Sequence, residues 1–168
     1  MTNTKKLFIL LFVAFSSVSA FAQLSCANDD KQLDFLIGDW ELFSNDGALI
    51  GENSIELIGG TCTFEESYKG FDGFNTQSIF KYDATNNKWL QDWSDDFGTN
   101  LKFEGQLTNG KLTLNATSID GNGQKTHHQV VYQKTSSGSL KHTWKQSNNL
   151  KDWNTTLSGT YKRKKAML

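Results

Sequence analysis

The feature that most constrains this chain is a series of about ten short segments, between residues 40 and 163, in which apolar and polar residues alternate. A period of two predicts β-strands with one buried face, because successive side chains of a strand point to opposite sides. Glycine, asparagine and aspartate occupy the joints, and the chain contains no proline. The predicted strands are 40–44, 51–58, 62–69, 74–82, 88–94, 100–107, 111–119, 125–134, 139–146 and 153–163.

The connections between these strands are short, which favours antiparallel neighbours. Asn109-Gly110 is the strongest hairpin signal, since both central positions of a type I′ turn need positive φ. After the N-terminal region only residues 31–37 could form a helical turn. Closing such a meander removes its exposed edges. We therefore predict an all-β fold, a single up-and-down antiparallel barrel of about ten strands, with a two-sheet sandwich as the alternative.

The N-terminus has the layout of a secretory signal peptide, with Lys5 and Lys6, an apolar run over 7–18, and an Ala-Phe-Ala site ending at Ala22. This predicts export, to the periplasm or the medium. The apolar run is short for a membrane span and no second run follows, so we expect no integral membrane span. The predicted divisions are a signal peptide at 1–22, an N-terminal arm at 23–33, the barrel domain at 34–163 and a basic tail at 164–168.

The net charge of the chain argues against nucleic acid as a partner. The formal net charge is −1, and loss of the two leader lysines makes it more negative. A mildly acidic chain, whose basic cluster is confined to the tail, does not suit nucleic acid. We expect a monomer or dimer that does not bind nucleic acid.

The chain has two cysteines, Cys26 and Cys62. In an exported protein such a pair favours one disulfide, which would tether the N-terminal arm to an early strand. Alternatively Cys26 is a lipid-modified N-terminus, although Gln23 stands where a lipidation signal has an aliphatic residue. Both alternatives stay open.

Several short motifs follow one another along the chain. They are DFLIGDW at 34–40, Gly60-Thr61-Cys62 with Glu66 and Tyr68, Tyr82-Asp83, Trp89-x-Gln91-x-Trp93 with Gly98, and Gly159-Thr160-Tyr161-Lys162-Arg163. Together they resemble a family of secreted bacterial proteins of unknown function, and the resemblance extends from about residue 34 to residue 163. That family is taken to be calycin-like, meaning lipocalin-like or nitrobindin-like β-barrels, so the resemblance implies a barrel with an interior site.

Lipocalins carry a similar Gly-x-Trp at the first strand, and an arginine from the last strand lies on the tryptophan. Gly38 and Trp40 match the first part, and Arg163, the only arginine in the chain, can match the second. Glycine permits a tight bend, tryptophan plugs one end, and a planar guanidinium stacks better than lysine. We therefore predict structural roles for these three residues and contact between Arg163 and Trp40.

Alternation also nominates residues for the barrel interior. Aromatic side chains interspersed with amides suit a pocket for an amphipathic molecule, yet they equally suit a filled core. The candidate pocket residues are Glu66, Tyr68, Trp89, Gln91, Trp93, His142 and Trp144.

Two of these candidates carry further hypotheses. Glu66 on an inner face must be paired, hydrogen-bonded or protonated. His142 could act with Glu66 in acid–base chemistry, or hold haem iron as an inward histidine does in nitrobindin-like barrels, or be a core residue. Adjacent His127 and His128 point to opposite faces, so we predict no metal site there.

Motifs of common enzymes are absent: the sequence has no HExxH, GxSxG, phosphate loop or CxxC. We therefore assign no catalytic residues and no cofactor, with haem as the alternative. The leading hypothesis is an exported barrel that binds a small apolar or amphipathic molecule. The alternatives are an enzyme of the same fold and an envelope interaction module with a filled core.

Overall fold

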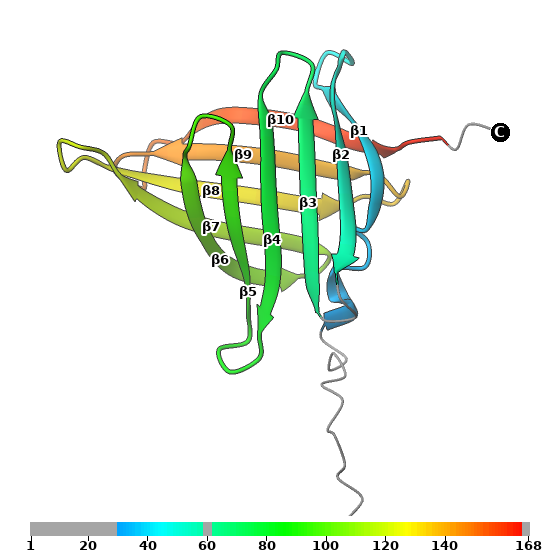
Figure 1. The fold of residues 1–168 in the computed structure, drawn as a ribbon, viewed down its shortest axis with the longest axis horizontal. Coiled ribbons are helices and arrows are strands. Elements are labelled where there is room, and N and C mark those ends of the chain that lie inside the picture. Colours follow the sequence, from blue (N-terminus) through cyan, green and yellow to red (C-terminus); the bar gives the residue numbers. More distant parts are fainter. Residues whose placement is uncertain (1–29, 59–61, 166–168) are drawn as a thin grey trace, which may run out of the picture.

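A computed structural model describes residues 30–58 and 62–165 as an all-β closed barrel (Figure 1). A short 3-10 helix, Asp30–Leu33, precedes the strands. Each strand pairs antiparallel with the next, and β1 pairs with β10 to close the barrel. The strands are β1 (Gly38–Ser44), β2 (Leu49–Ile58), β3 (Thr63–Gly70), β4 (Asn75–Asp83), β5 (Lys88–Asp95), β6 (Asn100–Thr108), β7 (Lys111–Ile119), β8 (Lys125–Lys134), β9 (Leu140–Ser147) and β10 (Asn154–Arg163).

The predicted fold class is thus confirmed, and the sandwich alternative was wrong. Predicted and observed strand ends agree within about two residues. The Asn109-Gly110 turn has φ of 51° and 72°, the positive values that a type I′ turn requires. The first two strands start earlier than predicted. Their backbones pair with each other, as Gly38 does with Ile55, beyond the residues that show clear alternation of apolar and polar side chains.

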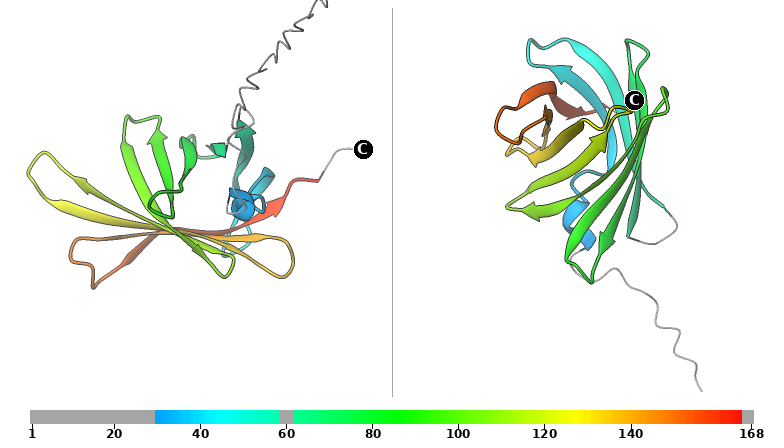
Figure 2. Two further views of the ribbon diagram at one scale, coloured as in Figure 1. Left: turned by 90° about the horizontal axis from the view of Figure 1, so that it is seen from below. Right: turned by 90° about the vertical axis from the view of Figure 1, so that its left-hand side faces the viewer.

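The barrel is flattened into two layers, with β2 to β5 running across β7 to β10 in Figure 1. Seen from two other directions, these layers face each other and the β7–β8 hairpin projects to one side (Figure 2). The interior between the layers contains the buried apolar side chains. Of the described residues, none belongs to a helix long and apolar enough to cross a membrane.

One end of the barrel is closed by the residues that the Gly-x-Trp pattern singled out. Trp40 pairs in register with Arg163, whose Cζ lies 3.9 Å from the centroid of the Trp40 ring. The predicted contact between them is therefore confirmed. The Arg163 guanidinium also donates to the Ile37 carbonyl, and Trp40 Nε1 donates to the Leu36 carbonyl over 2.8 Å. Gly38 has φ of 126°, and a Cβ there would overlap the Arg163 guanidinium.

Alternation misplaced one part of β10. Continuing the alternation of Leu157 and Tyr161 backwards predicts that Trp153 and Thr155 also face inward, but the register shifts between Thr155 and Leu157. Such a bulge reverses the facing of the residues before it. Thr155 and Thr156 are both exposed, and it is Thr156 that borders the cavity.

Several predictions concern residues outside the described ranges. The signal peptide at 1–22, most of the arm at 23–33 and Cys26 lie there, so export, lipidation and the disulfide of Cys26 with Cys62 stay predictions. The end of the arm is described: Leu33 is fully buried and belongs to the hydrophobic core.

Candidate ligand-binding cavity

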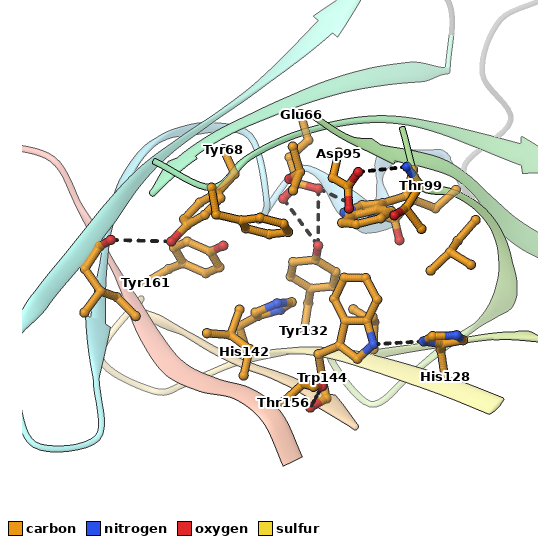
Figure 3. A pocket seen from close by; sticks show the side chains of 18 of the residues that line it. Glu66, Tyr68, Asp95, Thr99, His128, Tyr132, His142, Trp144, Thr156 and Tyr161 are labelled. Atoms are coloured by element: carbon orange, nitrogen blue, oxygen red, sulfur yellow. Dashed lines mark hydrogen bonds between the residues drawn. The ribbon is translucent and has the colours of Figure 1, made fainter. Parts of the chain in front are cut away.

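A cavity of about 650 Å³ lies inside the barrel (Figure 3). Its lining includes the β3–β4 and β5–β6 turns, which lie at the end of the barrel opposite Trp40 near the start of β1. Its wall combines side chains of β2 to β6 and β8 to β10 with the β3–β4 turn. Phe71 and Asp72 of that turn and Thr99 of the β5–β6 turn are exposed and also border the cavity. The cavity therefore reaches the surface between these two turns.

Most of the predicted pocket residues meet at this cavity. Trp89 does not border it; it packs at the closed end, with ring centroids 5.8 Å from Phe64 and 5.2 Å from Tyr82. Trp89 and Trp93 share a face of β5, but four residues of strand separate them by about 13 Å along its axis. The candidates that border the cavity are Glu66, Tyr68, Gln91, Trp93, His142 and Trp144.

Glu66 lies at the floor of the cavity, with 3% of its surface exposed. Asn53 Nδ2 donates to its Oε1 over 2.9 Å, and Gln91 Nε2 donates to Oε2 over 3.3 Å. The hydroxyl of Tyr132, from the opposite layer, is 3.3 Å from each carboxylate oxygen (Figure 3). This cluster links β2, β3, β5 and β8 across the interior.

Burial raises the pKa of Glu66, because the charged form loses its hydration. Hydrogen bonds from Asn53, Ser78, Tyr132 and Gln91 oppose this increase without cancelling it. The site thus holds a carboxyl group that takes up a proton more readily than a carboxyl group in water.

This raised pKa has a consequence for stability. Since the folded pKa exceeds the unfolded one, the contribution of Glu66 is present below the ordinary pKa of 4.5 and is lost as pH rises through the folded value. We expect Glu66→Gln to remove this loss, so that wild type and variant diverge with rising pH in urea unfolding. Glu65→Gln, at an exposed position of the same strand, controls for net charge. Parallel curves for wild type and Glu66→Gln would contradict the prediction.

His142 packs between two tyrosines, with ring centroids 4.6 Å from Tyr132 and 5.5 Å from Tyr161. Burial lowers the pKa of His142 from 6.5 to about 4, and the backbone of Val131 opposes this shift. His142 is therefore neutral near pH 7. Tyr132 lies between Glu66 and His142, and within the described chain no direct hydrogen bond joins these two groups.

The nitrobindin resemblance implies haem, and the residues present fit haem poorly. The rings of Tyr132 and Tyr161 pack against the His142 ring at tilts of 40° and 47°, so two tyrosines occupy space that a haem plane would need beside it. Asp72 and Asp95 stand at the mouth, where the two haem propionates would need cationic partners. Among the described residues around the cavity, none is lysine or arginine.

The predicted pocket residues did not include His128, Tyr132 and Tyr161, although alternation along the last strand places Tyr161 inside. His128 borders the cavity; its Nε2 lies 2.8 Å from Ser118 Oγ, and its Nδ1 accepts from Trp144 Nε1 over 3.4 Å. His128, Val130 and Tyr132 are two residues apart along β8, so alternation could have placed His128 and Tyr132 inside with Val130. The predicted opposite facing of His127 and His128 is confirmed, because only His128 borders the cavity and His127 contacts Thr117.

Aromatic rings continue from the cavity wall to its mouth. Trp93 meets Trp144 edge-on at 4.9 Å, and Phe74 lies 6.5 Å from Trp93 and 6.1 Å from Phe97. Phe97 is 78% exposed, so this row of rings runs from the interior into solvent. Such a row offers a continuous apolar surface to a molecule entering the barrel.

No known family model matches the sequence, and a search of curated proteins finds no significant relative. The closed barrel of ten antiparallel strands is consistent with a calycin-like fold. Membership of the particular family that the motifs resemble stays a prediction. Function must therefore be argued from the cavity itself.

Proposed function

We propose that this chain is an exported binding protein that takes a small apolar or amphipathic molecule into its barrel. The observation that carries the proposal is the cavity of about 650 Å³, which is in the range of small-molecule sites. Export rests on the leader sequence at residues 1–22 alone.

The lining of the cavity supports an amphipathic occupant. Trp93, Leu101 and Trp144 supply large apolar surfaces, whereas Glu66 and Gln91 place polar atoms at the floor. A site with a broad apolar wall and a few polar groups holds the body of a ligand by burial and orients it by hydrogen bonds. An interaction module with a filled core would not be expected to contain a cavity of this size.

An enzymatic role has weaker support. Acid–base catalysis by Glu66 and His142 would need both groups to reach the same bound substrate, but Tyr132 lies between them. The oxygens of Glu66 already accept hydrogen bonds from Asn53, Gln91 and Tyr132. This arrangement suits a fixed polar floor better than a group that transfers protons.

Filling the cavity tests the proposal. Thr76 borders the cavity and is buried, so we expect Thr76→Trp to occupy ligand space and weaken binding of Nile red, an uncharged apolar dye, by about tenfold or more. Dye fluorescence in a titration measures the affinity. Native mass spectrometry of protein purified from its source then shows whether a natural ligand is retained.

A neighbouring position supplies the control. Gln77 is exposed on the outer face of the same strand, so Gln77→Trp adds the same side chain outside the barrel and should leave dye affinity unchanged. Circular dichroism and urea unfolding establish that both variants are folded. Equal dye affinity in the two folded variants would overturn the proposal, as would a wild-type protein that does not bind the dye.

A further inference from the structure

We infer that the cavity selects molecules whose polar end is a hydrogen-bond donor, such as an alcohol or an amine, and discriminates against carboxylates. This inference deepens the proposed function and rests on it. Three features of the described lining support it. Its charged groups are carboxyl groups, the hydrogen-bond donors at its floor already bond to other protein atoms, and one hydrogen-bond acceptor at the floor has no partner.

The charged groups in the described part of the cavity lining are all acidic. Glu66 lies at the floor of the cavity, and Asp72 and Asp95 lie at its mouth. Neither lysine nor arginine contributes to the described lining. A carboxylate that entered would pass two like charges and lose its hydration without a cationic partner, which is costly in a partly enclosed site.

The hydrogen-bond donors at the floor of the cavity are committed within the protein. The Tyr132 hydroxyl and Gln91 Nε2 donate to Glu66, and Gln91 Nε2 also lies 3.0 Å from Ser78 Oγ. Trp144 Nε1 donates to His128. Each of these bonds would have to break before the donor could serve an anionic ligand.

An acceptor is left over at the same place. Gln91 Oε1 is buried and has no hydrogen-bond partner among the described residues. A buried carbonyl oxygen without a donor destabilises the site until a donor reaches it. His142 Nδ1 is also buried without a hydrogen-bond partner among the described residues. Both it and the Tyr161 hydroxyl can donate or accept, so they favour neither kind of ligand end.

Together these features orient the ligand. Its donor end lies against Gln91 and Glu66 at the floor. Its apolar body lies along Trp93 and Trp144 and points to the mouth. Lipid-derived acids have the opposite headgroup chemistry and should be poor ligands.

A series with one tail and three headgroups tests this inference. Dodecanol, dodecylamine and dodecanoate compete with Nile red for wild-type protein at pH 7, each below its micelle-forming concentration. We expect the alcohol and the amine to displace the dye, and the carboxylate to do so at least about tenfold more weakly. Carboxylate displacement as strong as that of the alcohol would overturn the inference and leave the proposed function standing. Failure of all three to bind would instead count against the proposed function.

Variants assign the discrimination to particular residues. Glu66→Gln replaces the floor carboxyl group by an amide that cannot ionise and keeps the shape of the side chain, so we expect dodecanoate to gain affinity relative to dodecanol. Asp72→Asn with Asp95→Asn does the same at the mouth; an asparagine oxygen can still accept from the Phe74, Phe97 and Thr99 amides as the aspartates do. Asp72 lies in the β3–β4 turn and Asp95 at the end of β5. This pair of substitutions therefore remains testable even if Glu66→Gln does not fold. An unchanged alcohol-to-carboxylate ratio in the folded variants would overturn the electrostatic part of the inference.

Discussion

Trp40→Ala should lower the free energy of unfolding by about 3–5 kcal/mol, because it removes a fully buried indole and opens a cavity at the closed end. The same change deletes the hydrogen bond to the Leu36 carbonyl and the surface on which Arg163 lies. Urea unfolding monitored by circular dichroism measures the loss.

Arg163→Lys is the matched partner of this variant. It keeps the positive charge but loses the planar head, so we expect a smaller loss of about 1 kcal/mol. Dye affinity should be unchanged, since Arg163 contacts Trp40 and Ile37 at the end opposite the cavity. A neutral Arg163→Lys together with a mild Trp40→Ala would contradict the view that this contact closes the barrel.

Acid should destabilise the protein by about 3 kcal/mol through His142 alone. The folded pKa of His142 is about 4 against an ordinary 6.5, and each unit is worth about 1.4 kcal/mol. Because the unfolded chain takes up this proton first, the stabilising contribution is complete above pH 6.5 and is lost as pH falls toward 4. Urea midpoints at pH 7 and pH 4 measure the effect.

His142→Phe isolates this contribution, since phenylalanine keeps a flat ring between Tyr132 and Tyr161 but does not titrate. We expect the variant to lose about 3 kcal/mol less than wild type between the two pH values. Glu66 acts with the opposite sign in both proteins, so its effect cancels in the comparison. Equal losses in the two proteins would show that His142 is not held neutral by burial.

The two ends of the barrel contribute to different properties of the protein, namely stability and ligand binding. Trp40, Arg163 and Trp89 are at the closed end and contribute stability, whereas the cavity and its exposed aromatic residues are at the other. Changes at the closed end should therefore alter unfolding without altering binding. This separation makes the binding experiments interpretable even where a variant is somewhat less stable.

Sequence patterns correctly predicted the fold class, the strand boundaries within about two residues, and the contact of Trp40 with Arg163 at the closed end. These features depend on local signals. Alternation specifies which face of a strand is buried, turn residues specify where the chain reverses, and an up-and-down barrel makes its first and last strands neighbours. The same alternation correctly placed Glu66, Gln91 and His142 in the interior.

The depth of each inner residue along the barrel, and its contacts across the interior, could not be predicted from these patterns. Alternation cannot separate Trp89 from Trp93, because both have the same facing but lie at different depths. It could not show that Tyr132, from the opposite layer, would donate to Glu66 over a sequence separation of 66 residues. Nor could it show the bulge before Leu157, since one extra residue shifts the register without leaving a distinct pattern. Cavity volume and hydrogen-bond partners arise from packing between distant strands, and local periodicity does not encode that packing.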